Sequence, residues 1–164
     1  GEVSAEQLTA QAISRATACQ PTLNAFIEIW ADKAMAQARA MDAERARGKV
    51  RGRLQGIPLA HKDCFEIHGH AATIGSRARP AVVATSDART IERLNEAGAV
   101  TLGVLNLNEM VAGPTGQNPI FGDCCNALDP ARISGGSSSG SGVAVAAAGG
   151  VLAACAASTL SSTT

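Results

Sequence analysis

Apolar and small residues recur at helical spacing near the start of the chain. The predicted buried face of this first helix carries Leu8, Ala12, Ala16 and Cys19. Ser4, with Gln7 three residues further on, forms the capping-box pattern that starts a helix. Pro21 lacks a backbone N–H, so the pattern predicts that the helix stops there.

The next two segments differ in their pattern of apolar and charged residues. Residues 24–30 form a short apolar stretch that fits either a strand or the lead-in to a helix. Residues 32–47 are rich in alanine with interspersed charges, and Gly48 follows them, which predicts a second helix.

An alternation of strand and helix follows. Residues 56–63 read as a strand that ends in polar side chains. Residues 85–97 read as a helix with Asp87 near its start, and residues 99–105 as a buried strand. This order predicts an α/β fold in which neighbouring strands run parallel. After it, Asn108 is expected to cap one short turn, and residues 113–130 read as loop.

Composition narrows the class of protein. The 164 residues are 46% hydrophobic and 17% charged, with a formal net charge of zero, which is typical of a globular domain and offers no footprint for nucleic acid. The longest apolar run, residues 143–157, is interrupted by glycines and too short to predict a membrane span. Five cysteines without a CxxC pair indicate reduced thiols and a cytoplasmic compartment.

Residues 134–142 form a Gly/Ser run that leads directly into the small-residue helix predicted from residue 143. Such a run is typical of a flexible linker or turn. It is also compatible with a loop that binds an anion or substrate at a helix N-terminus. Its spacing is neither that of a P-loop nor that of a dinucleotide site.

Taken in order, several blocks resemble the amidase-signature family. Residues 56–63, GIPLAHKD, resemble its GIPxxxKD strand, and residues 73–76, TIGS, resemble its TxGS block. Residues 97–109, AGAVTLGVLNLNE, resemble AGAxxxGKxNxxEF. Residues 116–130 keep the spacing of the family loop TGxNxxYGxxxNPxDP, and residues 135–141, GGSSSGS, match GGSSxGS.

The resemblance implies a Ser–cisSer–Lys triad that cleaves carboxamide bonds. Lys62 would be the general base and then acid, Ser137 would relay the proton from within a cis peptide, and Ser161 would be the nucleophile. A serine needs a base to take its proton, and a lysine serves only when its pKa is lowered enough for it to be neutral. Should the register slip by one residue, Ser162 would replace Ser161.

The resemblance also implies where substrate would bind. The expected oxyanion and substrate-binding positions are Ser158, Thr159, Leu160, Gly113, Gly135 and Gly136. Thr159 and Leu160 stand where the family has two glycines, which let the loop turn tightly and point N–H groups at the oxyanion.

Three functions remain open: an amidase acting on a small amide, an inactive fragment or pseudoenzyme, and a protein like the amidase-type subunit of an amidotransferase. The resemblance implies a mixed sheet flanked by helices, with residues 1–164 as the N-terminal part of a single domain. The partners left open are a second copy in a homodimer or the remaining part of a longer chain. On its own, the chain is expected to self-associate.

No cofactor is implied, and no metal site is expected. His68 and His70 alternate along a possible strand, but two ligands do not make a zinc site. The neighbouring Cys124 and Cys125 are expected to be ordinary loop residues.

Overall fold

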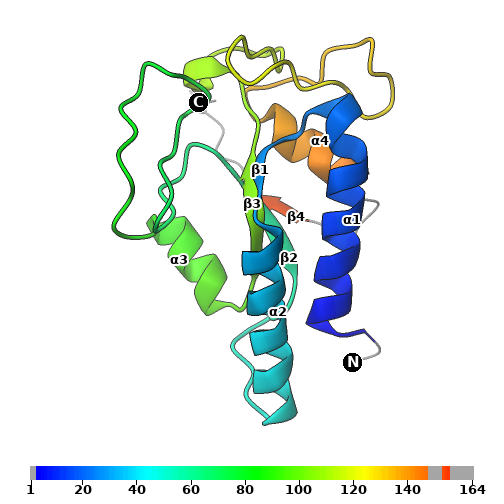
Figure 1. The fold of residues 1–164 in the computed structure, drawn as a ribbon, viewed down its shortest axis with the longest axis vertical. Coiled ribbons are helices and arrows are strands. Elements are labelled where there is room, and N and C mark those ends of the chain that lie inside the picture. The colour runs from blue at the N-terminus through cyan, green and yellow to red at the C-terminus, as the bar shows by residue number, and fades with distance from the viewer. Residues whose placement is uncertain (1–2, 148–152, 156–164) are drawn as a thin grey trace, which may run out of the picture.

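Four strands form one mixed sheet at the centre of the molecule. The computed structural model describes residues 3–147 and 153–155. Its strands lie in the order β1 (Phe26–Ile29), β3 (Val100–Leu105), β2 (Pro58–Lys62) and β4 (Ala153–Cys155), as Figure 1 shows. β2 runs parallel to both β3 and β4, whereas β1 is antiparallel to β3. The predicted α/β class and the parallel neighbours are confirmed.

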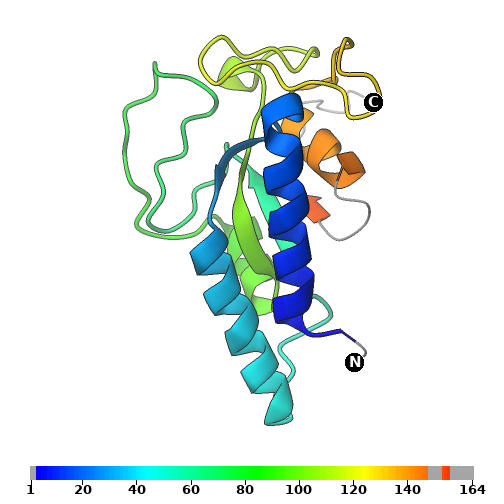
Figure 2. The same cartoon turned by 45° about the vertical axis from the view of Figure 1, so that its right-hand side comes forward.

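Helices cover both faces of this sheet. α1 (Ala5–Leu23), α2 (Ala31–Ala46) and α4 (Ser139–Ala147) share one core with the sheet, built largely from alanines and the β3 residues Val100, Leu102 and Leu105. α3 (Arg89–Glu96) packs on the other face, where Ile91 meets Ile67 and Val104. Figure 2 shows α1 and α2 lying side by side. Their buried faces are mostly alanine, which allows this close approach.

The first helix begins as predicted but ends later. Ser4 accepts a hydrogen bond from the Gln7 backbone while the Gln7 side chain accepts one from the Ser4 backbone. Asp42 of α2 adds a second cap, since its carboxylate accepts from the backbone N–H groups of Ala5 and Glu6. The expected stop at Pro21 is wrong. The proline removes only one backbone hydrogen bond, and the helix continues past it. It ends at Asn24, which adopts the left-handed conformation typical of a helix C-terminus.

Three other sequence expectations can be compared with the structure. The ambiguous stretch 24–30 contains strand β1, and α2 matches the predicted second helix closely. α3 begins at Arg89, four residues later than expected. Asp87 does not cap it, because its carboxylate accepts from the His68 backbone and from the Asn95 side chain instead.

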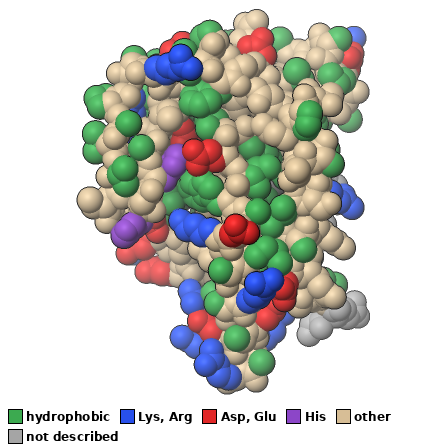
Figure 3. Space-filling model, in the orientation of Figure 1, with side chains coloured by type: hydrophobic (Ala, Val, Ile, Leu, Met, Phe, Trp, Pro, Cys, Tyr) green, Lys and Arg blue, Asp and Glu red, His purple; other side chains and the backbone are tan. Residues whose placement is uncertain are grey.

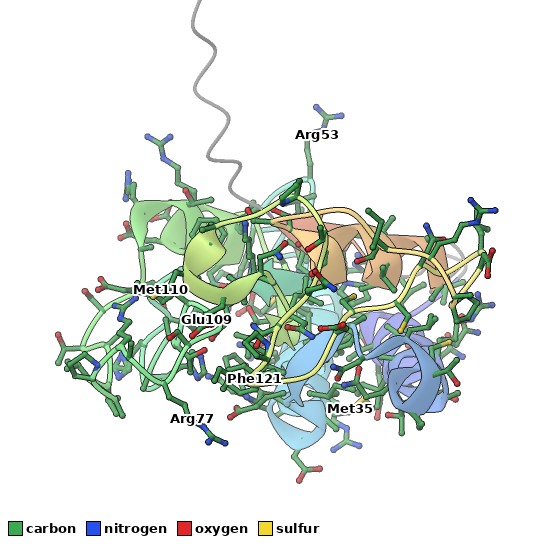
Figure 4. All side chains as sticks on the ribbon, turned by 90° about the horizontal axis from the view of Figure 1, so that it is seen from above. Met35, Arg53, Arg77, Glu109, Met110 and Phe121 are labelled. Carbon is green, nitrogen blue, oxygen red and sulfur yellow. The ribbon has the colours of Figure 1, made fainter. Side chains whose placement is uncertain are left out.

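Loops between residues 106 and 138 cover the end of the sheet where β2 and β3 finish, at the top of Figure 1. Buried asparagines hold these loops in place. Asn106 donates to the carbonyl oxygens of Asn24 and Gly122, and Asn118 donates to those of Gly75 and Leu107. Seen from above in Figure 4, Glu109 and Met110 lie on the short turn η1 (Glu109–Val111) of this layer.

Charged side chains gather at the opposite end of the molecule. Figure 3 shows Lys and Arg concentrated over the far end of α2 and the loop after it. The cations of that segment are Arg45, Arg47, Lys49, Arg51 and Arg53. None of the helices described in the structure is long and apolar enough to cross a membrane.

Candidate functional site

Lys62 is the last residue of β2, and its amine lies in the protein interior. The residue has 0% relative exposure. Its Nζ donates to Ser137 Oγ at 2.8 Å and to Ser138 Oγ at 2.9 Å. The pairing of Lys62 with Leu105 at the end of the β2–β3 ladder sets the position of the strand end. The fold therefore brings a buried amine onto two hydroxyls that lie 75 and 76 residues further along the chain.

Burial changes the chemistry of this amine. Removal from water lowers the pKa of Lys62 below its ordinary value, an effect that the nearby Cys64 opposes in part. A lowered pKa increases the fraction of neutral amine near neutral pH, and only the neutral form accepts a proton. Ser137 can both donate and accept a hydrogen bond, so the pair can pass a proton along it.

The Gly/Ser run is built into the fold, so the linker interpretation is wrong. Helix α4 starts at Ser139, four residues before the predicted start. Gly140 N donates to Asn106 O at 2.9 Å, which joins the first turn of the helix to the end of β3. The peptide bond between Gly136 and Ser137 is cis, as the resemblance implies.

Asn108 holds the cis peptide in place, a role that the sequence expectation missed. Its side chain does not cap η1. Instead, Asn108 Oδ1 accepts from Gly116 N at 2.9 Å, while Nδ2 donates to Thr115 Oγ1 and Gln117 O. Its backbone N–H donates to Ser137 O at 3.2 Å. The only sequence signal for this role was that Asn108 directly precedes Glu109 of the family motif. That position does not reveal which loops the Asn108 side-chain amide would join.

Gly136 has to be a glycine because of this packing. A Cβ there would collide with Asn108 Oδ1 and would lie 3.0 Å from Gly116 N. Gly113 also borders Asn108, since a Cβ built on it would lie 3.1 Å from Nδ2. The structure thus brings together two of the predicted substrate-binding positions, Gly113 and Gly136, both exposed, beside the half-buried Ser137. Gly135 directly precedes Gly136, has a φ of +80°, and has no described atom within 4 Å of a Cβ built on it.

The remaining predicted site residues lie outside the residues that the structure describes. These are Ser158, Thr159, Leu160, Ser161 and the fallback Ser162. The described part of the site therefore consists of a buried amine, a half-buried hydroxyl and an exposed glycine face. A nucleophile placed over that face could pass its proton through Ser137 to Lys62.

A second polar cluster lies beside the lysine. Asp63 is buried, and its carboxylate accepts from His70 Nε2 at 2.7 Å, Thr73 N at 2.9 Å and Thr73 Oγ1 at 2.5 Å. The expectation that His68 and His70 share a strand is wrong, because both lie in the loop after β2. Across residues 3–147 and 153–155, no three His, Cys, Asp or Glu residues are grouped as metal ligands would be.

Of the two neighbouring cysteines, Cys124 has surroundings that lower its reactivity. Cys124 is buried, and burial raises the pKa of its thiol to about 11. The thiolate is the nucleophilic form, so a raised pKa makes this thiol inert.

Comparison with known proteins gives one family. The family model described as Amidase matches residues 7–158. A glutamyl-tRNA(Gln) amidotransferase subunit of Ralstonia nicotianae is 46% identical over 145 residues, which are 88% of this chain and 29% of that protein. The same subunit of Cupriavidus necator is 44% identical over 144 residues, covering 88% of this chain and 28% of that protein. The chain thus spans less than a third of the length of these relatives.

Solved structures give the same result. A crystal structure of an amidase superposes with a TM-score of 0.84 at 40% identity, covering 90% of this chain and 34% of that one. The peptide amidase of Stenotrophomonas maltophilia superposes with a TM-score of 0.81 at 37% identity, covering 89% of this chain and 31% of that one.

Proposed function

This chain belongs to the amidase family, and we propose on that premise that it is the N-terminal part of a longer amidase domain that hydrolyses carboxamides. The observation that carries the proposal is the 2.8 Å contact between the buried Lys62 amine and the Ser137 hydroxyl. Most buried lysines cost stability, because their amine loses its hydration. In a protein of this family, a site that places a buried lysine amine against serine hydroxyls is suited to proton transfer.

The proposed reaction runs through a serine ester. Neutral Lys62 takes the proton of Ser137, Ser137 takes that of Ser161, and the Ser161 oxygen attacks the amide carbonyl carbon. The tetrahedral intermediate collapses when the same relay returns the proton to the departing nitrogen, which leaves as ammonia or an amine. Water then attacks the ester by the reverse route, releasing the carboxylic acid and restoring the serine.

The proposed oxyanion and substrate positions follow from the family motif. Backbone N–H groups around Ser158, Thr159 and Leu160 would face the developing oxyanion, and Gly113, Gly135 and Gly136 would border the acyl group. We also propose the cytoplasm as the compartment, in keeping with free thiols at Cys19, Cys64, Cys124 and Cys125.

The experiment is covalent labelling of the full-length protein with a serine-directed fluorophosphonate. Ser161→Ala is expected to abolish labelling, whereas the neighbouring Ser162→Ala leaves it unchanged. Lys62→Met keeps the length of the side chain without its amine and is expected to slow labelling by about 100-fold or more. The exposed Lys49→Met serves as its control. Labelling that survives Ser161→Ala contradicts the assigned nucleophile, and a wild-type protein that is never labelled favours the pseudoenzyme.

One observation favours a second function. The relatives named above are amidotransferase subunits with up to 46% identity to this chain. Such a protein would use the same serine ester to release ammonia from glutamine for a partner subunit. Hydrolysis of simple linear amides by the full-length protein alone supports the hydrolase. Release of ammonia from glutamine only when partner subunits and charged tRNA are present supports the amidotransferase.

A further inference from the structure

We propose that His70 is a positioning residue for Lys62: by donating from Nε2 to the Asp63 carboxylate, it fixes the strand end that presents the amine to Ser137. The inference rests on the proposed hydrolase function, because it gives His70 a part in preparing the base of that reaction. Among the described residues, no hydrogen bond joins His70 to Ser137, Gly113 or Gly136, and the path from His70 to Lys62 runs through Asp63.

The end of a strand is where the backbone needs support. Lys62 forms the last pair of the β2–β3 ladder, opposite Leu105. Immediately after it the chain turns, since Cys64 N donates to Lys62 O at 2.7 Å. Beyond the ladder, the direction of the Lys62 side chain depends on how Asp63 is held. A shift of about 1 Å at such a position is enough to lower a catalytic rate by about 100-fold.

Asp63 is held from its side chain and its backbone at once. Its N–H donates to Leu105 O at 3.2 Å, and its carbonyl accepts from Ile74 N at 2.9 Å. One carboxylate oxygen takes both hydrogen bonds from Thr73, and the other takes the one from His70. Because the carboxylate has 0% relative exposure, no water is available to replace a lost donor. Without His70, one buried carboxylate oxygen of Asp63 loses its hydrogen-bond donor, and Asp63 is held less firmly.

His70 is itself held firmly enough to do this. Its ring meets Trp30 edge-on, with the ring centroids 5.2 Å apart. Its backbone N–H donates to Ile67 O at 2.9 Å, and its carbonyl accepts from Ala84 N at 3.0 Å. A donating Nε2 fixes the tautomer, because a carboxylate only accepts. The imidazole therefore joins the loop after β2 and the β1–α2 junction to the residue that follows the lysine.

The test uses three variants of the full-length protein. His70→Leu removes the donor while filling similar space, and His70→Gln restores an amide donor at a similar reach. His68→Leu is the matched control, since His68 lies two residues away in the same loop with its side chain exposed. The first readout is the second-order rate of fluorophosphonate labelling, measured where all variants are fully folded. The second is the NMR titration of the Lys62 ε-carbon in protein with ¹³C-labelled lysine, which needs no activity.

The expected result separates positioning from bulk stability. His70→Leu is expected to slow labelling by about 10- to 100-fold. It is also expected to move the Lys62 pKa toward its ordinary value, because a loosened amine reaches water. His70→Gln should restore most of the rate and the titration, and His68→Leu should match the wild type in both.

Two results would overturn the inference. One is a folded His70→Leu protein whose Lys62 titrates as in the wild type. The other is a His70→Gln protein as impaired as His70→Leu, which would make ring shape the requirement rather than the hydrogen bond. If His70→Leu does not fold, ¹⁵N NMR of the wild-type imidazole decides instead, since an Nε2 without a proton excludes the bond. A wild-type protein that is not labelled rejects the hydrolase function alone, because the lysine titration still tests the positioning.

Discussion

At the scale of single residues, β2 ends with two buried basic side chains that face opposite ways. The Lys62 amine meets Ser137 and Ser138, while His61 Nε2 lies 3.3 Å from Thr101 Oγ1. Successive side chains of a strand point to opposite faces, so the two groups are in different surroundings. One basic group serves the proposed reaction, and the other has to remain neutral within the core.

His61 predicts how stability depends on pH. Burial lowers its pKa from 6.5 to about 4. Below pH 6.5 the unfolded chain takes up a proton that the folded chain refuses, so stability falls as the pH drops, until the folded pKa near 4 is reached. This contribution amounts to about 3 kcal/mol over the window.

Urea denaturation of the full-length protein at pH 7 and at pH 4.5 measures the effect. His61→Gln keeps a polar side chain but cannot take up the proton, so its loss of stability across the window should be smaller than that of the wild type. Equal losses in the two proteins would contradict the assigned titration.

At the scale of elements, helix α4 depends on where its small residues lie. A Cβ at Gly140 would collide with Ala25 O and would lie 2.7 Å from both N and O of Asn106. Gly142, two residues on and exposed, has open space around it. The two glycines of one helix therefore differ: Gly140 allows close contact with the end of β3, whereas a Cβ at Gly142 would meet no atom of the residues that the structure describes.

Alanine at these two positions is predicted to have opposite effects. Gly140→Ala should destabilise the protein by about 1–3 kcal/mol, because neighbouring backbone has to move. Gly142→Ala should stabilise it by about 0.5–1 kcal/mol, since alanine loses less conformational entropy in a helix. Thermal unfolding of the full-length variants measures both. Stabilisation by Gly140→Ala would show that the contact between α4 and Asn106 is looser than described.

At the scale of the whole molecule, the described residues leave a sheet edge unpaired and an apolar side chain exposed. Within the described residues, β4 pairs with β2 on one side only. α4 leaves Val145 41% exposed. The chain also spans only 28–29% of the amidotransferase subunits that it resembles. These features fit a sheet that continues in the rest of a longer domain, or one that is covered by a second copy.

The 164-residue chain on its own is therefore predicted to self-associate, because unpaired sheet edges and apolar surface attract each other. Sedimentation velocity should show a concentration-dependent distribution of oligomers, whereas the full-length protein should sediment as a single species. That species would be a monomer if the rest of the chain completes the sheet, or a dimer if a second copy does. A monodisperse monomer of the short chain would contradict the prediction.

The sequence by itself determined the local features and the family. Periodicity located α2, β2 and β3, the capping box started α1, and the ordered motifs gave the amidase resemblance, because each of these signals lies within a few neighbouring residues. It failed where other parts of the chain intervene: α1 continues through Pro21, and α3 begins only at Arg89, beyond Asp87, whose carboxylate binds His68 and Asn95.

The resemblance already implied that Lys62 and Ser137 meet, and only the tertiary structure decided how they meet and which further residues hold them. The contact of Lys62 with Ser137, the hold of Asn108 on the cis peptide and the pairing of His70 with Asp63 all depend on how β2, β3 and the loops above them are arranged. Hydrogen bonds between segments carry no local signature in the sequence, because any nearby donor can satisfy a buried acceptor. The sheet order and the loop geometry select one donor, and that selection positions the Lys62 amine.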